Sequence, residues 1–234
     1  MLTLRGEGIS RQFIRKRKDS NVFYAVEKTD FELPPGTMTV LSGESGSGKS
    51  TLLHMLAGLL RPTEGKVLLG DNDLYSLDDK PLSVLRNRHI GLVPQGQTPL
   101  MALTVKENIL LPCTLYRQKD GESAVDREKL AEELMERTGI ADLRDVLPKE
   151  LSGGELRRMA IARALIMDPD VILADEPTGD LDDENTEIVL GLFKEQAGKG
   201  KAVFLVTHDR DTFAYADRRF TMRSGKIEAV RDEA

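Results

Sequence analysis

A glycine-rich loop near residue 45 separates an apolar strand from an amphipathic helix, and this junction restricts the fold more than any other part of the chain. The strand is predicted over 38–41. Leucines at helical spacing predict the helix over 50–60, where Arg61-Pro62 ends it. The loop between them fits the pattern G-x-x-x-x-G-K-[ST]. The junction therefore predicts an α/β fold that binds a nucleotide phosphate at the carboxyl end of the strand.

The side chains of this loop have separate expected roles. Lys49 should reach the β and γ phosphate oxygens, and the Ser50 hydroxyl should hold Mg²⁺. An ordinary glycine turn is the alternative, but the flanking strand and helix favour the phosphate site. The residues expected to bind nucleotide here are Gly43, Glu44, Ser45, Gly46, Ser47, Gly48, Lys49 and Ser50.

Two carboxylates follow the all-apolar strand predicted over 171–174. Such strands are typical of parallel sheets that are buried on both faces, and open α/β sheets bind ligands at the carboxyl ends of their strands. We expect Asp175 to orient the Mg²⁺ shell and Glu176 to polarise the water that attacks the γ-phosphate. Solvated acids also end strands commonly, so this assignment depends on the phosphate loop upstream.

A histidine and a glutamine end two other predicted strands. His208 closes the strand over 202–207, which should bring it to the same sheet edge as Glu176, within reach of the γ-phosphate and the attacking water. Gln95 follows the apolar stretch 90–93, and its amide could ligate Mg²⁺ and connect the site to a neighbouring lobe. Taken alone, each would be an ordinary structural or loop residue.

A second glycine pair at a helix start has no task in a nucleotide site made by one chain. The segment 151–155 precedes a helix predicted over 156–167, so its N–H groups form another anion site. One ATP does not need two phosphate cradles, whereas two copies arranged head to tail could each cap the other's γ-phosphate. A capping box is the alternative, and both can hold together. The residues expected to act across such a dimer are Ser152, Gly153, Gly154 and Glu155.

The order of the predicted elements indicates one domain with an inserted lobe. β segments are predicted over 2–9 and 22–33, a helix over 126–138 and a hairpin over 219–230. Strands and helices alternate from residue 171 onward, which predicts a parallel sheet. The expected division of the single domain 1–234 is a nucleotide-binding core with a β subdomain over 1–95 and 151–234, and a helical lobe over 96–150 together with the start of 151–167.

Charge and cysteine content restrict the partners and the compartment. A net charge of −6 disfavours nucleic acid as the main partner, because its phosphates would be repelled, and the basic segment 15–18 is interpreted as a solvated turn. The single Cys113 permits no internal disulfide, which fits a reducing cytoplasm. No run approaches the ~20 apolar residues of a membrane helix. A membrane process would therefore need another chain to span the bilayer.

Taken in order, these motifs resemble those of the nucleotide-binding subunit of an ATP-binding cassette transporter over nearly the whole chain. In that family's terms, Gln95 resembles the Q-loop and His208 the switch histidine. The other matching segments are Walker A at 43–51, which adds Thr51 to the nucleotide-binding residues, the signature at 151–155, Walker B at 171–176 and the D-loop at 178–182.

The resemblance implies two further site residues. Asp182 is the last aspartate of the D-loop, which in the family contacts the site of the opposite subunit. Phe13 lies where the family places an aromatic residue that stacks on adenine, and Tyr24 is also available for this role. Glu155 stands where many relatives have glutamine, and Asp180 stands where asparagine is usual in the group that the chain resembles most. Neither departure removes a catalytic role.

Within the family, the segments 103–109, 151–155 and 173–179 resemble those of lipoprotein-releasing, macrolide-export and cell-division ATPases. This resemblance implies a P-loop NTPase core with a mainly parallel sheet, an N-terminal antiparallel β subdomain and an inserted helical lobe. It also implies an ATPase that uses ATP and Mg²⁺ and drives a separate integral membrane permease. The implied dimer closes around two ATP molecules with a second nucleotide-binding subunit, which makes a homodimer if that subunit is an identical copy and a heterodimer otherwise.

The implied location is cytoplasmic, peripheral on the inner face of the cell membrane. Export, or mechanotransmission of the lipoprotein or macrolide type, is the expected work, and the alternative is an ATPase of a non-transporting membrane regulatory complex. No nucleic acid partner is expected. The apolar loop after the Q-loop should contact the membrane partner through Thr98, Pro99, Leu100, Met101 and Leu103.

Overall fold

The central sheet of the computed structural model, which describes residues 1–14, 22–115 and 124–230, is mainly parallel, as predicted. Its strand order is β10-β9-β3-β8-β7-β6, and among these described strands only β9 and β10 pair antiparallel. Every residue of β3, β7 and β8 is buried, because both faces of the sheet are covered. The strands are β3 (Met38–Ser42), β6 (Ile90–Val93), β7 (Val171–Asp175), β8 (Ala202–Thr207), β9 (Arg218–Arg223) and β10 (Lys226–Ala229).

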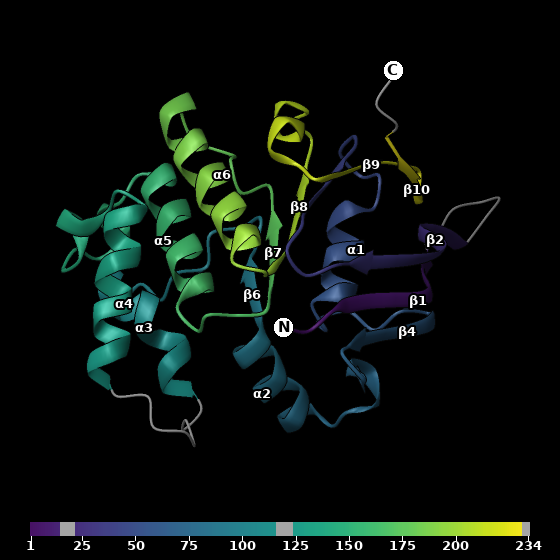
Figure 1. Cartoon of the computed structure of the whole chain (residues 1–234), viewed down its shortest axis with the longest axis horizontal. Coiled ribbons are helices and arrows are strands. Elements are labelled where there is room, and N and C mark those ends of the chain that lie inside the picture. The colour runs from purple at the N-terminus through teal and green to yellow at the C-terminus, as the bar shows by residue number, and fades with distance from the viewer. Residues whose placement is uncertain (15–21, 116–123, 231–234) are drawn as a thin grey trace.

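A smaller antiparallel sheet with the order β2-β1-β4-β5 forms the predicted β subdomain (Figure 1). Its first strand continues past residue 9 as far as Ile14, since pairing with β2 satisfies the backbone of the polar stretch. The sequence did not predict β4 and β5, which are short and rich in polar residues, and the basic segment 15–18 lies outside the described residues. The strands are β1 (Leu4–Ile14), β2 (Val22–Leu33), β4 (Glu64–Leu69) and β5 (Asn72–Asp73).

Most helices start or end close to the predicted residues, with two corrections. The helix after the phosphate loop ends at Leu56 and not at the Arg61-Pro62 pair, because Gly58 is left-handed with a φ of 69°. The signature helix begins at Gly153 and not at residue 156, so the signature glycines form its first turn. The helices are α1 (Lys49–Leu56), α2 (Asp79–His89), α3 (Val105–Leu115), α4 (Ala124–Arg137), α5 (Gly153–Leu165) and α6 (Asp183–Gly198).

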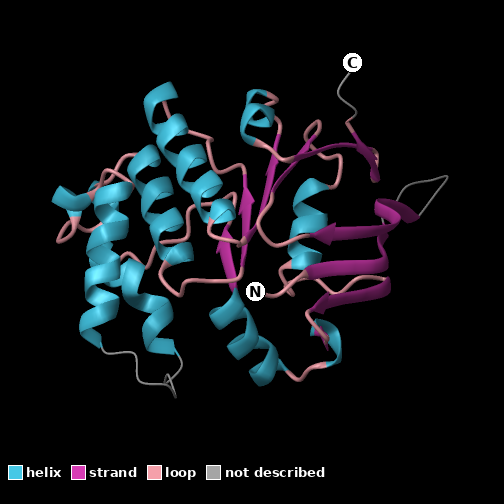
Figure 2. Cartoon of the chain, viewed as in Figure 1, coloured by secondary structure: helices cyan, strands magenta, loops and turns pink. Residues whose placement is uncertain are grey.

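The central sheet divides two hydrophobic cores. Along β8, Val203 and Leu205 face the core shared with α3 to α6, whereas Phe204 and Val206 face the core shared with α1 and the antiparallel sheet. Figure 2 shows the result, with α3, α4 and α5 gathered at one end of the molecule and the antiparallel strands at the other. Along the described residues, no helix combines the length and apolarity needed to cross a bilayer.

Candidate functional site

The phosphate loop between β3 and α1 depends on glycine for its path. Gly48 has a φ of 112°, and a Cβ at this position would lie 1.9 Å from the carbonyl oxygen of Ala25. At Gly43, a Cβ would lie 2.4 Å from the carbonyl oxygen of Met222. Both neighbours are backbone atoms, so a larger residue would displace the loop. The two glycines therefore allow the loop to lead directly into the N-terminus of α1.

Lys49 is the first residue of α1 and lies inside the curve of the loop. Its side chain is nearly buried, at 7% exposure. The Nζ atom donates to the carbonyl oxygen of Gly43 at 2.7 Å and to that of Glu44 at 3.1 Å. An ammonium group held here places a positive charge where phosphate oxygens would meet the loop.

A cavity of about 560 Å³ opens beside the loop and brings together polar residues from three strand ends. Gln95 follows β6, Glu176 follows β7 and His208 follows β8, and parallel pairing brings these ends to one edge of the sheet. The residues that line this cavity include Phe13, Phe23, Ser45, Gly46, Gly48, Lys49, Ser50, Thr51, Gln95, Glu176 and His208.

Glu176 and His208 form a hydrogen-bonded pair at the wall of this cavity. The Oε2 atom of Glu176 lies 3.0 Å from Nδ1 of His208 and accepts a hydrogen bond from the Thr207 hydroxyl at 3.0 Å. The glutamate side chain is 14% exposed, whereas that of His208 is 73% exposed. A fixed carboxylate that still reaches the cavity can accept a proton from water.

Asp175 ends β7 beneath the phosphate loop and is 1% exposed. Burial raises the pKa of the Asp175 carboxyl above its ordinary value, and a hydrogen bond from the Ser50 side chain opposes only part of that rise. The Oδ1 atom has no hydrogen-bond partner among the described residues, so it is an unsatisfied buried acceptor. Oxygen ligands of this kind suit Mg²⁺, which usually keeps water and substrate phosphate as its other ligands. Ser50 and Asp175 therefore offer oxygen atoms of the kind that Mg²⁺ binds, and Gln95 lines the same cavity as Ser50.

The apolar end of the cavity consists of two phenylalanines. Phe13 of β1 pairs with Phe23 of β2, and their rings stack with centroids 5.8 Å apart and an interplanar angle of 26°. Tyr24 is the next residue of β2, so its side chain points to the other face of the strand. Of the two aromatic candidates from the sequence, Phe13 lines the cavity and Tyr24 does not. Sequence reasoning missed Phe23, which only the strand register identifies.

The signature turn lies outside this cavity, at the N-terminus of α5. Ser152 is exposed, and its hydroxyl accepts a hydrogen bond from the N–H of Glu155 at 3.3 Å. The Glu155 carboxylate accepts one from the Ser152 N–H at 2.7 Å, which completes the capping box expected from the sequence. Gly153 is also exposed. Among the described residues, no part of the signature lines the cavity that holds Lys49 and Glu176.

Asp182 has a local structural task at the start of α6. Its carboxylate caps the helix by accepting hydrogen bonds from Asn185 N at 2.8 Å and from Asn185 Nδ2 at 2.7 Å. These bonds lower the pKa of the Asp182 carboxyl, which is exposed. The aspartate, at the end of the D-loop, is therefore held in one orientation at the surface.

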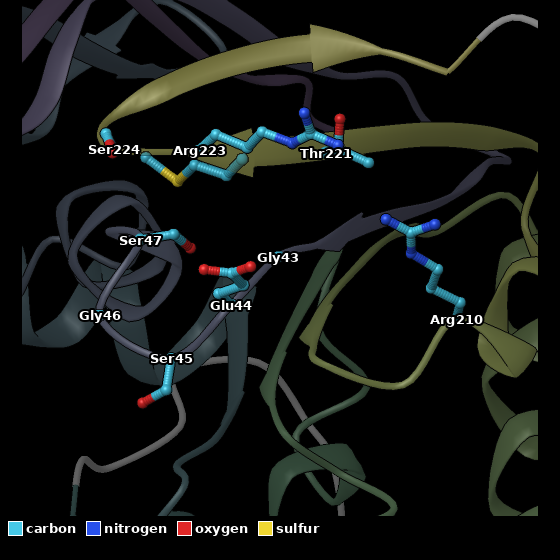
Figure 3. A pocket seen from close by; sticks show the side chains of 10 residues that line it. Gly43, Glu44, Ser45, Gly46, Ser47, Arg210, Thr221, Arg223 and Ser224 are labelled. Atoms are coloured by element: carbon cyan, nitrogen blue, oxygen red, sulfur yellow. The ribbon is translucent and has the colours of Figure 1, made fainter.

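A neighbouring cavity of about 530 Å³ is lined by five of the expected nucleotide-binding residues: Gly43, Glu44, Ser45, Gly46 and Ser47. Ser45 and Gly46 also line the first cavity. Figure 3 shows the side chains of Glu44 and Ser47 on this side of the loop, facing the strand that carries Arg223. Arg210 approaches the same space from another loop. The side chains of Glu44 and Ser47 therefore face away from the cavity that Lys49 lines.

Comparisons with known proteins agree with this geometry. A family model described as ABC transporter matches residues 26–179. An uncharacterized ABC transporter ATP-binding protein of Thermotoga maritima is 42% identical over 206 residues, which cover 88% of this chain and 86% of that protein. The lipoprotein-releasing system ATP-binding protein LolD of Shewanella sp. (strain MR-4) is 39% identical over 208 residues, 88% of each chain.

A solved structure supports the same assignment through the fold. The dimeric post-hydrolysis state of the ATP-binding cassette MJ0796, bound to ADP and Pi, has a TM-score of 0.88 and 31% sequence identity. The superposition covers 98% of this chain and 100% of that one. The chain therefore belongs to the ABC transporter family and is one of its ATP-binding, ATP-hydrolysing subunits.

Proposed function

We propose that two copies of this chain close head to tail around two ATP molecules, each copy completing the other's site. The observation that carries this proposal is the separation of the two phosphate-binding helix starts. The cavity beside Lys49 holds Gln95, Glu176 and His208, while Ser152 caps an exposed helix N-terminus elsewhere. The dimeric MJ0796 cassette, which shares this fold, supports an assembly of two such chains.

Within each site, the residues would have distinct tasks. The loop over 43–51 would bind the phosphates, and the stacked rings of Phe13 and Phe23 would receive the adenine. The Glu176 carboxylate would accept a proton from the attacking water, and His208 would hold that water and the γ-phosphate by hydrogen bonds. The 3.0 Å contact between His208 Nδ1 and the glutamate supports a joint role.

Ser50, Asp175 and Gln95 would hold Mg²⁺. When bound, this ion would neutralise negative charge on the phosphates. The unsatisfied Oδ1 atom of Asp175 supports this assignment. A cluster of three or more His, Cys, Asp or Glu side chains suited to a metal is absent from the described part of the chain. This agrees with an ion that takes most of its ligands from substrate and water.

Across the dimer, Ser152, Gly153 and Gly154 would present N–H groups and a hydroxyl to the partner's γ-phosphate. Glu155 would keep this turn rigid through its bonds to Ser152. Asp182 would contact the opposite site from the surface position that its helix cap fixes. A rigid turn favours this role, because little conformational entropy is lost when the phosphate arrives.

The membrane partner would be an integral permease that contacts the apolar loop after the Q-loop. Leu100 and Met101 are 49% and 59% exposed and adjacent in the loop, so they present a continuous apolar surface to a partner. Thr98 at the loop's start borders a groove of about 270 Å³ between the core and the helical lobe. Arg163 of the lobe donates hydrogen bonds to the carbonyl oxygen and hydroxyl of Thr98. Binding of the permease to this loop would place the chain peripherally on the inner face of the membrane.

The work of the complex would be export or mechanotransmission of the lipoprotein-releasing or macrolide type. The similarity to a LolD protein supports the lipoprotein-releasing class. A non-transporting regulatory complex is the less favoured alternative, because the family model and the Thermotoga maritima relative are both named as ABC transporter proteins.

The decisive experiment is to measure the mass of the Glu176→Gln chain by light scattering with excess Mg-ATP. We expect a nucleotide-dependent dimer and loss of turnover, because ATP would bind without being consumed. Glu187→Gln is the matched control, since Glu187 is an exposed acid on α6, and it should hydrolyse ATP normally. A Glu176→Gln chain that binds ATP but remains monomeric would refute the shared site.

A further inference from the structure

A buried arginine lies one turn after the signature, and its side chain reaches the backbone of the Q-loop. Arg157 is 4% exposed. Its Nη1 atom donates to the carbonyl oxygen of Pro94 at 2.8 Å, and Nη2 donates to that of Gln95 at 2.9 Å. Arginine is rarely buried to this degree without partners, because its charge must leave water. The guanidinium therefore binds the signature helix directly to the segment that carries Gln95.

Acidic residues around the site compensate this buried charge. Burial lowers the pKa of Arg157, and three carboxylates oppose that shift, with Asp180 acting more strongly than Asp175 or Glu176. Asp180 is the D-loop position where the sequence departs from the usual asparagine. The D-loop also lies against the guanidinium, because a Cβ at Gly179 would be 3.9 Å from Nη2 of Arg157. Asp180, the next residue, therefore adds a negative charge close to the buried arginine, while the other two carboxylates belong to the ATP site.

The D-loop also packs directly on the signature turn. A Cβ at Gly154 would lie 3.3 Å from the carbonyl oxygen of Asp180, and one at Gly153 would lie 3.6 Å from its Cβ. On the other side, Gln97 of the Q-loop segment donates to the carbonyl oxygen of Gly153 at 3.0 Å. Three segments that are far apart in sequence thus meet around the start of α5.

We infer that Arg157 is a positioning residue that joins the signature helix, the Q-loop and the D-loop into one unit, with Asp180 as its counter-charge. This inference rests on the proposed function, because the unit would place Gln95 in one site and Ser152 in the partner's site. The two contributions of Arg157 can be separated. Its two nitrogens fix the Q-loop carbonyls, and its positive charge balances Asp180 beside the catalytic carboxylates.

Three variants separate the two contributions. Arg157→Gln removes the charge, Arg157→Lys keeps the charge but lacks the fork of two donors, and Asp180→Asn removes only the counter-charge. Asparagine suits position 180, where φ is 67°, because it tolerates the left-handed conformation. Melting temperature and circular dichroism establish that each variant is folded before its activity is compared.

The expected result is a rescue. Arg157→Gln should lower kcat about tenfold, which corresponds to about 1.4 kcal/mol of barrier, while the ATP affinity of the monomer stays within about twofold, because Arg157 does not line the cavity. The double variant Arg157→Gln with Asp180→Asn should have a kcat at least about threefold higher than that of Arg157→Gln alone, because neither residue of the pair would then be charged. Adding Asp180→Asn to Arg157→Lys should not raise kcat, because lysine keeps the positive charge that Asp180 balances.

Hydrogen exchange in the monomer gives a second, independent readout. Amides over 95–97 should exchange faster in both Arg157 variants, since the carbonyl contacts are weakened in each. Unchanged exchange, or an Asp180→Asn effect that multiplies the Arg157→Gln loss without rescuing it, would overturn the inference. A monomeric Glu176→Gln chain would refute the proposed dimer alone, because the exchange measurement needs only the monomer.

Discussion

Replacing Asn108 with alanine should destabilise the helical lobe, because this side chain organises the loop over 98–104. Asn108 is fully buried. Its Oδ1 accepts from the N–H of Leu100 at 2.8 Å, and Nδ2 lies 3.1, 2.9 and 3.0 Å from the carbonyl oxygens of Leu100, Leu103 and Thr104. An amide has two hydrogens, so about three of these bonds act at full strength at one time.

The magnitude follows from that count. At about 1 kcal/mol net for each hydrogen bond, the Asn108→Ala chain should lose about 3 kcal/mol of unfolding free energy. For a domain of this size, that loss lowers the melting temperature by about 6 to 12 °C. Urea unfolding followed by circular dichroism measures the free energy, and differential scanning fluorimetry measures the temperature.

The matched control is Asn87→Ala. Asn87 is half-buried and donates a single hydrogen bond to the carbonyl oxygen of Pro112 at 3.1 Å, so about 1 kcal/mol should be lost. If Asn108→Ala cost no more than this control, the loop would not depend on the amide and the reasoning would be refuted. The variant should still hydrolyse ATP, because Asn108 does not line the ATP cavity. It should associate less with membranes, because the loop proposed to contact the permease would lose its organising side chain.

Two other predictions concern the ATP cavity and the signature cap. Phe13→Ala should weaken ATP binding about threefold to tenfold, the loss of about 1 kcal/mol of stacking, whereas Tyr24→Ala should leave it unchanged in a fluorescent nucleotide titration; equal losses would contradict the assignment of the aromatic wall. Hydrogen bonds from the Ser152 N–H and hydroxyl hold the pKa of Glu155 below its ordinary 4.5. Its stabilising contribution is therefore present above pH 4.5 and is lost as the pH falls through the lowered native pKa. The stability difference between wild type and Glu155→Ala should shrink in acid, and a difference that stays constant from neutral pH to acid would exclude this cause.

Local sequence patterns predicted the parts of the fold that short-range physics controls. The strand–loop–helix around Gly43 to Lys49 and the buried strands β7 and β8 follow from apolar runs and glycine placement. The predicted end of α1 was wrong, because the helix stops at Leu56, before the left-handed Gly58, and does not continue to Pro62. The polar helix α2 and the short strands β4 and β5 carry too few apolar residues for periodicity to find them.

The candidate site likewise contains residues that the sequence predicts and residues that depend on contacts between distant segments. Gln95, Glu176 and His208 were predictable because parallel strands deliver their carboxyl ends to one edge. Phe23 depends on the register between β1 and β2, which the sequence alone does not specify. Arg157 was missed because an arginine in a helix is normally solvated, and its contacts with Pro94 and Gln95 span more than 60 positions of sequence.

Two site residues have a left-handed backbone that the sequence patterns did not predict. Glu176 and Asp180 adopt left-handed conformations with φ values of 49° and 67°, although neither is glycine. Each such residue costs of order 1–3 kcal/mol and persists only where the surroundings fix it. The N–H of Glu176 donates to the carbonyl oxygen of Val206 at 2.8 Å, and its carboxylate is held by Thr207 and His208. These contacts with β8 and with His208 hold the carboxylate at the cavity wall without a bound nucleotide. The strain therefore lowers folding stability, whereas the fixed carboxylate would need less reorganisation during hydrolysis.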